Sequence, residues 1–505
     1  MSGTDGPQVS LATPDFVDRC VQYGRALLIR YRDFKIAQDE LGDLIQRLEV
    51  HWGNLELEIQ YFTGVQDYVG SEIQLRFERL VNSLYNKLQD IGLKLERTAI
   101  QGKRTFSRKT TFLGLLKNSL KGATSELSEC NTLLQPLLFL LARISDSRID
   151  RESNLGSNKA ISAVRNLRHA LKPTSSRTLE PFIVFKDFER DRELIKYTSV
   201  MIKRLPTEDR DVIIDSIACV GPAAVNISRD IRDLARVLKE VEPMTFGILA
   251  CRGLVKVKAP NGKLSKLEMV FDVPKELKNP RSLRNLLISL NLGHGRHPIN
   301  ARIQLAKRLA RTVFFVHSAD FVHKNFRPET IILFDHCDKP DDQSLAREIG
   351  FPFLVGYQKI RLANGPTAYL GDSAWEQNIY RHPSRQGEFP EQAYVMQHDI
   401  YSLGVCLLEI ALWKSFVLVD AYGQTALKSA ESERVLKDTR NASEVKERLI
   451  QMAQDMIPTN LGNRYAEVTI SCLKCLDEDS TEFLAEDKTP VGVSYIEKVN
   501  QSITT

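Results

Sequence analysis

Apolar residues recur at helical spacing through the first third of the chain. Between residues 41 and 62 they step alternately by four and three positions, the a/d pattern of a helix that packs along one apolar face. This set is Leu41, Ile45, Leu48, Trp52, Leu55, Ile59 and Phe62. Residues 73–95, 131–144 and 160–171 show further helical periodicity. Almost nothing in residues 10–172 alternates as a strand does, so we predict an all-α bundle of about four to six helices there.

The pattern changes after a Pro/Ser/Thr-rich stretch at 173–180, which is typical of a linker. Short β-rich runs follow at 182–185, 247–255 and 267–273, and Asn261-Gly262 favours a hairpin turn between the last two. Helical patterns lie at 226–240, 282–287 and 299–316, and residues 188–225 read as a long insertion. The fold class is therefore α+β, with a bundle over 10–172 and a strand-containing domain over 181–505.

Composition narrows the class of protein. The chain has 505 residues, and its net charge of +5 is small for that length, so we expect no nucleic-acid partner. The N-terminus has no signal-peptide pattern, and no apolar run reaches the roughly 18–20 residues of a membrane span. Eight scattered cysteines suit a reducing cytosol, and their only close pair, Cys472 and Cys475, has no second pair for a metal site. We predict a cytoplasmic protein without a metal.

A basic stretch without acidic residues lies between Glu96 and Glu126. Its cations are interleaved with Phe and Leu residues, and the strongest cluster is Lys103, Arg104, Arg108 and Lys109. Two interpretations are open. The stretch is either a solvated loop followed by a core-facing helix, or a surface that binds anionic lipid headgroups.

Residues 321–334 contain a motif that resembles part of an enzyme active site. His323 begins a stretch that resembles the catalytic loop of protein kinases, H-R-D-x-x-x-x-N, but Asn325 stands where the catalytic aspartate belongs and Thr330 where the metal-binding asparagine belongs. Residues 356–358, Gly-Tyr-Gln, align with D-F-G, so Gly356 replaces a metal ligand. The stretch around Asp399 matches the motif of a central helix of the same fold. The order of these motifs is similar to that of a two-lobed protein-kinase-like domain over 181–505.

The resemblance implies which parts of the kinase machinery this chain keeps and which it lacks. A kinase needs a lysine on a strand to hold the nucleotide phosphates, and Lys186, after the β-rich run at 182–185, is the candidate. No glycine-rich phosphate loop precedes it. Loss of a general base alone costs about 100- to 10,000-fold in rate. We therefore expect no catalysis, no bound cofactor and no metal, although ATP binding without phosphoryl transfer stays open. In kinases the counterpart of Asp399 accepts hydrogen bonds from the catalytic-loop backbone, and we expect a structural role for Asp399 here.

The N-terminal bundle resembles a known family as well. Residues 16–24, the basic run 25–32 and the helix through Trp52 are similar to the HeLo domain of fungal prion-inhibition and propagation proteins, which occur in cell-death and incompatibility systems. Its first helix carries charged residues that pore-forming members lack, so we expect no direct pore formation. A HeLo bundle joined to a degenerate kinase is similar in architecture to mixed-lineage kinase-domain-like pseudokinases.

Three hypotheses about function follow from these resemblances. The first is a non-enzymatic signalling protein, whose pseudokinase binds a protein partner and whose bundle then oligomerises or meets an anionic membrane. The second is an unconventional active Ser/Thr kinase that uses displaced residues. The third is a pure interaction scaffold that dimerises through its heptad face, which requires the face around Trp52 to be exposed.

Overall fold

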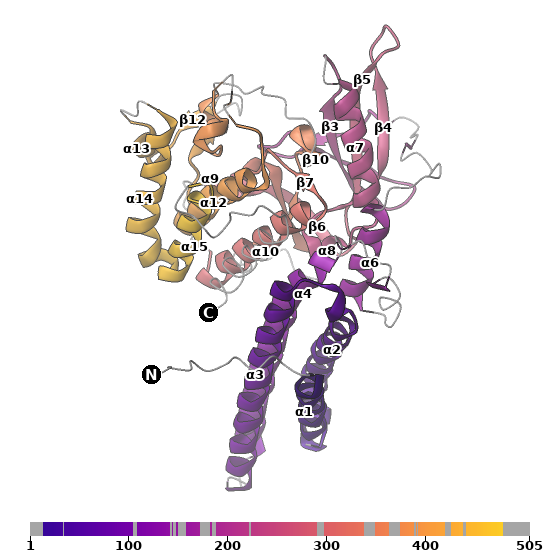
Figure 1. Cartoon of the computed structure of the whole chain (residues 1–505), viewed down its shortest axis with the longest axis vertical. Helices are drawn as coiled ribbons and strands as arrows, with labels where there is room; N and C mark the ends of the chain where they lie inside the picture. The colour runs from indigo at the N-terminus through magenta and orange to yellow at the C-terminus, as the bar shows by residue number, and fades with distance from the viewer. Residues whose placement is uncertain are drawn as a thin grey trace, which may run out of the picture. The chain divides into compact units, whose positions relative to one another are not determined.

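The chain divides into two compact units, residues 1–165 and 166–505. The computed structural model describes residues 14–33, 35–104, 109–141, 144, 148–149, 158–171, 182–183, 188–221, 224–289, 297–337, 349–362, 374–387, 390, 392–419, 426–437 and 441–477. The first unit is helical and the second contains the sheets, as Figure 1 shows. The predicted α+β class is confirmed at this level. The predicted linker, 173–180, lies outside the described residues.

Four long helices build the described part of the first unit. They are α1 (Pro14–Arg32), α2 (Lys35–Val65), α3 (Ser71–Arg104) and α4 (Lys109–Leu140), with a short turn η1 (Gln66–Tyr68) between α2 and α3. A shorter helix, α6 (Lys159–Leu171), spans the point where the two units divide. All seven a/d residues of α2 are buried, Trp52 at 2% exposure. Trp52 lies against Gly24 of α1, where any larger residue would overlap its ring.

A five-stranded antiparallel sheet begins the second unit, in the order β1-β2-β3-β5-β4. Its strands are β1 (Glu193–Leu194), β2 (Met201–Leu205), β3 (Arg210–Ala218), β4 (Ala250–Lys258) and β5 (Leu264–Asp272). The helix α7 (Ala224–Lys239) packs against β4. The turn of the β4–β5 hairpin contains Gly262 at φ +77°, a conformation that favours glycine. The hairpin predicted at Asn261-Gly262 is confirmed.

One prediction about this region is wrong. Residues 188–225 are not an insertion, because they contain β1, β2 and β3, the strands on which the sheet is built. The run predicted as a strand at 182–185 is described only at 182–183, where Phe182 forms an isolated bridge to Leu254 of β4. The strand that comes directly before α7 is therefore β3, and this changes which side chain faces the candidate site.

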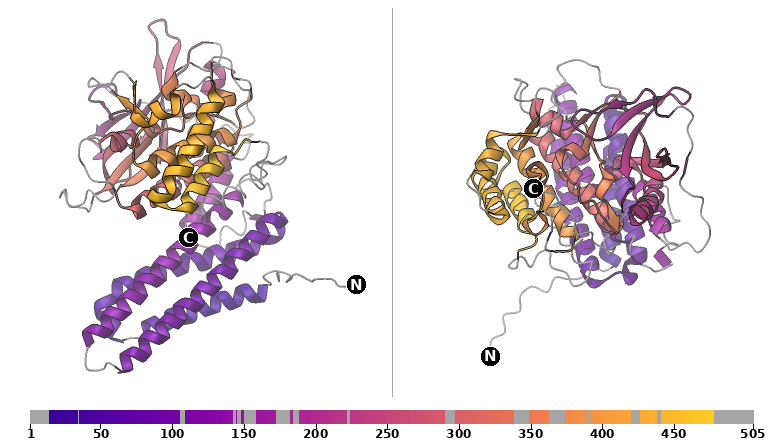
Figure 2. Two further views of the ribbon diagram at one scale, coloured as in Figure 1. Left: turned by 90° about the vertical axis from the view of Figure 1, so that its left-hand side faces the viewer. Right: turned by 90° about the horizontal axis from the view of Figure 1, so that it is seen from above.

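The rest of the unit is mostly helical. Its helices are α8 (Pro243–Phe246), α9 (Leu283–Ser289), α10 (Ile299–Ser318), α11 (Trp375–Asn378), α12 (Met396–Leu412), α13 (Ala430–Leu436), α14 (Ala442–Leu461) and α15 (Asn463–Leu473). The buried helix α12 contacts α10, α14 and α15, and the last two lie side by side at the side of the unit away from the five-stranded sheet (Figure 2).

Short strands and turns connect these helices. They are β6 (Leu277–Ser282), β7 (Phe321–Val322), η4 (Pro328–Thr330), β8 (Ile331–His336), β9 (Phe351–Leu354), η6 (Tyr357–Lys359), β10 (Arg361–Leu362), η7 (Pro383–Arg385), β11 (Val417–Val419) and β12 (Ala426–Lys428). They form a three-stranded sheet, β6-β8-β9, and the pairs β10-β7 and β11-β12. The loop between β7 and β8 contains residues 323–330, whose sequence resembles a kinase catalytic loop.

Candidate functional site

The loop 323–330 is held by one carboxylate at the start of α12. Asp399 accepts hydrogen bonds from the backbone amides of His323, at 2.8 Å, and Lys324, at 2.9 Å. The hydroxyl of Tyr394 donates to it at 2.7 Å, and His317 Nε2 lies 3.2 Å away. Burial opposes the charge on Asp399, but His317 and the other donors outweigh it and lower its pKa to about 2. Asp399 therefore supports the loop as a buried, ionised anchor.

His323 points into the core and not toward a reactive group. Its Nε2 lies 3.1 Å from the carbonyl oxygen of Val355, and its ring packs edge-on against Tyr357, with 5.4 Å between centroids. Burial is the main cause that lowers the pKa of His323 to about 4. The imidazole is therefore neutral near pH 7 and fills a packing position.

Asn325, Thr330 and Gly356, the positions singled out from the sequence, come together and are linked by hydrogen bonds. Thr330 Oγ1 lies 2.9 Å from the carbonyl oxygens of both Asn325 and Arg327. The side-chain amide of Asn325 donates to the carbonyl of Gly356 and to Gln358 Oε1, both at 3.2 Å. The Thr330 hydroxyl and the Asn325 side-chain NH2 group are therefore used inside the protein.

Gly356 sits where a side chain has no room. Its φ is +84°, and a Cβ atom added there would lie 2.5 Å from Thr330 Cγ2. Both the backbone conformation and the neighbour disfavour a larger residue. A carboxylate at position 356 would need Thr330 to move.

An acidic residue that sequence analysis missed faces this segment from the sheet. Asp215, in the middle of β3, is fully buried, and its Oδ2 accepts hydrogen bonds from the amides of Gly356, at 2.9 Å, and Tyr357, at 2.8 Å. Its Oδ1 accepts one from Gln358 Nε2 at 2.8 Å. Burial raises its pKa to about 6 although the two backbone donors oppose the shift. The only sequence feature that could have pointed to Asp215 is that it interrupts the apolar run of β3.

The connection between β1 and β2 is tied down at two points. Gln358 Nε2 also donates to Ser199 Oγ at 2.9 Å, and Ser282 Oγ donates to the carbonyl oxygen of Lys196 at 2.8 Å. Ser282 also accepts from the amide of Asn285 as α9 begins. The β1–β2 connection is thus bonded both to the 356–358 segment and to the start of α9.

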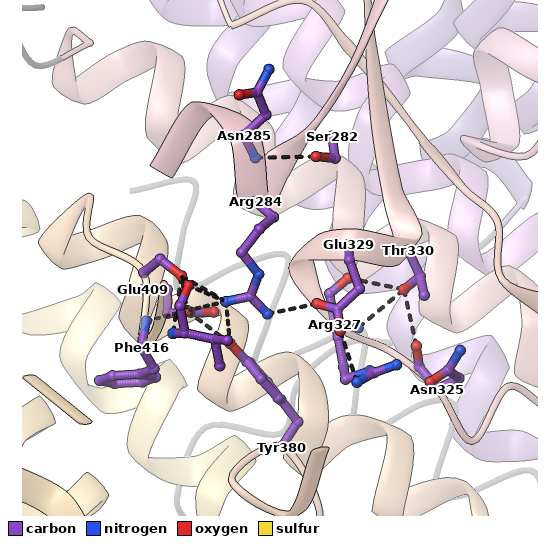
Figure 3. Close-up of polar contacts among 12 residues, drawn as sticks. Ser282, Arg284, Asn285, Asn325, Arg327, Glu329, Thr330, Tyr380, Glu409 and Phe416 are labelled. Atoms are coloured by element: carbon purple, nitrogen blue, oxygen red, sulfur yellow. Dashed lines mark hydrogen bonds and ion pairs between the residues drawn. The ribbon is translucent and has the colours of Figure 1, made fainter. Parts of the chain in front are cut away.

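A second polar network lies beside the loop, and Figure 3 shows it. Arg284 of α9 forms ion pairs with Glu329 at 2.6 Å and with Glu409 of α12 at 3.5 Å. Tyr380 donates to Glu409 at 2.8 Å, and so does the amide of Phe416, at 2.7 Å (Figure 3). This network joins α9, the loop and α12 around one buried guanidinium.

The two carboxylates of this network have opposite pKa shifts. Burial opposes ionisation of Glu329, but the charges of Arg327 and Arg284 outweigh it and lower the pKa of Glu329 to about 2. Burial raises the pKa of Glu409 to about 7, and Arg284 only partly offsets it. We conclude that Glu329 carries the negative charge that balances Arg284.

The remaining predicted residues are only partly described. Lys186 and Arg108 lie outside the described residues. Lys103 is in the last turn of α3, Arg104 ends that helix and Lys109 begins α4, but their side chains lie outside what is described. Within the described ranges, no group of three or more His, Cys, Asp or Glu side chains is arranged to hold a metal ion. The same residues contain no helix with the length and apolar character of a membrane span.

Comparison of the chain with models of known protein families and with curated protein sequences gives no match.

Proposed function

We propose that this chain is a non-catalytic signalling protein in which a degenerate protein-kinase-like region controls a HeLo-type helical bundle. The non-catalytic part of this proposal rests on the position of Asp215, whose carboxylate accepts hydrogen bonds from the amides of Gly356 and Tyr357. In a kinase, the strand before the regulatory helix presents a lysine to the nucleotide phosphates. Here the strand before α7 is β3, and the side chain that it directs toward the Gly356 segment is a carboxylate.

Charge argues against a nucleotide at this place. A triphosphate carries several negative charges, and a buried carboxylate beside it would repel it, where a lysine would attract it. The positions that would bind metal are Gly356, which has no ligand atom on a side chain, and Thr330, whose hydroxyl is bonded to the loop backbone. Without a cation to bridge the phosphates, phosphoryl transfer lacks its main source of charge neutralisation.

The order of elements supports the kinase-like part of the proposal. The five-stranded sheet, with α7 inserted between β3 and β4, comes first. The long helix α10, the loop supported by Asp399 and the buried helix α12 follow it in the chain. The scaffold hypothesis required an exposed heptad face around Trp52. Trp52 is buried within the first unit, which argues against dimerisation through that face.

A ligand-binding measurement on the full chain tests the non-catalytic part. We expect the thermal unfolding midpoint to be the same with and without ATP and Mg²⁺. A nucleotide present at 100 times its Kd would add about 2.7 kcal/mol of stability, which is easily detected. A magnesium-dependent rise, or ATP turnover that Lys186→Met abolishes, would favour the active-kinase hypothesis instead.

A sedimentation assay tests the bundle. Vesicles that contain anionic lipid should carry the full chain down once the partner or activating condition is supplied, and vesicles of neutral lipid should not. Reversal of the charges at Lys103, Arg104, Arg108 and Lys109 should reduce this binding strongly, since each cation contributes about 1 kcal/mol near such a surface. Unchanged binding would remove the basic stretch from the proposal.

A further inference from the structure

The turn of the β4–β5 hairpin carries cations that no nearby acid balances. Residues 251–267, which include this turn, contain five cations and no acid. Lys256, Lys258 and Lys263 are exposed, and none of them forms an ion pair with a residue that the structure describes. Lys256 Nζ lies 3.5 Å from the centroid of the Phe182 ring. The other two cations of the range pair with acids, so the unbalanced charge is that of the three lysines.

The two most exposed large apolar side chains among the described residues lie at the same end of the sheet. Val220 is 64% exposed and Val225 is 78% exposed. Val220 follows β3 by two residues, and the amide of Cys219 donates to the carbonyl oxygen of Ser265 at 2.8 Å, so Val220 lies beside the beginning of β5. Val225 is in the first turn of α7, the helix that begins at this end and packs against β4.

This end of the second unit projects from the sheet. The last pair that joins β3 to β5 is Ala218 with Lys266, whereas β4 and β5 stay paired as far as Lys258 and Leu264. The hairpin therefore continues past the end of β3, as Figure 1 shows. Exposed lysines and exposed valines thus occupy one projecting end.

The chemistry of this end fits the surface of an anionic bilayer. Ammonium groups attract anionic headgroups, and the aliphatic side chains leave water when they enter the boundary between headgroups and acyl chains. A nucleic-acid site would use aromatic side chains to stack bases, and residues 216–229 and 251–267 contain none. A site for carboxylates or phosphates of a protein would favour arginine, which binds them with two parallel hydrogen bonds, whereas the unpaired cations here are lysines.

We propose that Val220, Val225, Lys256, Lys258 and Lys263 form a surface that binds a bilayer containing anionic lipid. We call these five residues the hairpin-end surface. The valines enter the headgroup boundary, and the lysines hold the charged headgroups around them. This contact is independent of the proposed function, because none of the five residues belongs to the first unit or to positions 323–358.

Sedimentation of the full chain with vesicles tests the hairpin-end surface. Every chain in the test carries glutamine in place of the four cations at positions 103–109, so that binding through them does not contribute. We expect vesicles of phosphatidylcholine and phosphatidylserine to bind the chain at least about tenfold more tightly than vesicles of phosphatidylcholine alone.

Replacement of the lysines should remove most of this binding. K256Q/K258Q/K263Q should weaken binding to the anionic vesicles at least about tenfold, since each lysine near such a surface contributes about fivefold. K256R/K258R/K263R keeps the charges and should bind as the unaltered surface does. The matched control removes three exposed lysines elsewhere in the second unit and should weaken binding less than about twofold, because these charges lie away from the bilayer. It is K275Q/K437Q/K474Q.

The valines have a separate readout. V220S/V225S should weaken binding to the anionic vesicles about tenfold, because two apolar side chains no longer leave water. L194S/L427S changes two other exposed leucines and should leave binding unchanged. In addition, the fluorescence of V225W should be quenched by brominated lipid, and that of L427W should not.

Four results would overturn the proposal. They are no binding to the anionic vesicles, equal binding to the neutral ones, equal losses for the two lysine triple variants, and unchanged binding of V220S/V225S. The last result would indicate a purely electrostatic surface for an acidic protein or a nucleic acid. None of these results alters the expected response to ATP and Mg²⁺, so failure here is distinguishable from failure of the proposed function.

Discussion

The carboxylate of Asp215 accepts a hydrogen bond from the backbone amide of Gly356, 2.9 Å away, across 141 positions of sequence. This contact joins the five-stranded sheet to the segment in which a kinase would bind its metal. Under the proposed function, a buried acid and a glycine stand at two positions where a kinase has a lysine and an acid. The carboxylate satisfies the backbone amides of both Gly356 and Tyr357 inside the protein.

Replacement of Asp215 should destabilise the second unit. Asp215→Ala leaves the amides of Gly356 and Tyr357 as buried donors without an acceptor and removes one of the two acceptors of Gln358 Nε2, so we expect a loss of about 2–4 kcal/mol. Urea unfolding of the full chain measures it. Asp209→Asn serves as the control, because that side chain is 92% exposed and Asn tolerates the left-handed backbone at φ +50°, and it should cost less than about 0.5 kcal/mol. Equal effects of the two changes would contradict the role given to Asp215.

A methyl group at position 356 should be costly, and part of the cost should be recoverable. Gly356→Ala brings its Cβ to 2.5 Å from Thr330 Cγ2 and strains a backbone at φ +84°. We expect a loss of about 2–4 kcal/mol in unfolding free energy. Thr330→Ser removes the clashing methyl but keeps the hydroxyl, so G356A/T330S should be more stable than the sum of the single changes predicts. Strict additivity would show that the clash is absent.

Arg284 should be the most sensitive side chain of the second network. Arg284→Ala removes the guanidinium that lies between Glu329 and Glu409 and leaves Glu329 with Arg327 alone, and we expect a loss of about 3–5 kcal/mol. Arg229→Ala is a control on an arginine whose side chain is 51% exposed, with an expected loss below about 1 kcal/mol. Chemical denaturation of both variants measures the two losses of unfolding free energy. A loss for Arg284→Ala no larger than the control's would mean that the network contributes little.

A buried acid in the first unit should make stability depend on pH. Glu58 of α2 is 1% exposed and accepts a hydrogen bond from Asn158 at 3.2 Å. Burial is the main cause that raises its pKa to about 8, from 4.5 in an exposed chain. Between these two values the folded state keeps a proton that the unfolded state releases, so stability falls as pH rises from about 4.5 to about 8.

The difference in pKa corresponds to about 3–5 kcal/mol between pH 4.5 and pH 8. Glu58→Gln cannot ionise, and urea unfolding followed by far-ultraviolet circular dichroism should show a flatter pH profile for it. Glu96→Gln changes an acid whose side chain is 58% exposed and should leave the profile as it was. The same slope in Glu58→Gln as in the unaltered chain would assign the pH dependence to another group.

Several elements could be predicted because their patterns are local. The a/d residues of α2 are buried, since a repeat of four and three positions places them on one side of any helix that forms there. The helix predicted at 299–316 is α10, Ile299–Ser318, and the predicted hairpin joins β4 to β5. These features depend on neighbours within a few residues.

The strands β1, β2 and β3 were missed for the opposite reason. β1 has only two residues and both are exposed, so it has no hydrophobic pattern of its own. The acid in β3 interrupts an apolar run, and in the sequence alone this counts against a buried strand. β3 becomes a central strand only because β2 and β5 pair with it on either side.

Hydrophobic periodicity in the chain thus predicted the helices of the first unit and the long helix α10, whereas the replacement of reactive residues at positions 325, 330 and 356 follows only from the kinase resemblance and stays a prediction. Whether a polar residue such as Asp215 can be buried depended on the tertiary fold, which brings the amides of Gly356 and Tyr357 within 3 Å of it. The physical reason is that apolar burial needs only a suitable face, whereas a buried charge needs particular donors in a particular geometry. Those donors come from distant parts of the chain, and so no local sequence pattern predicts them.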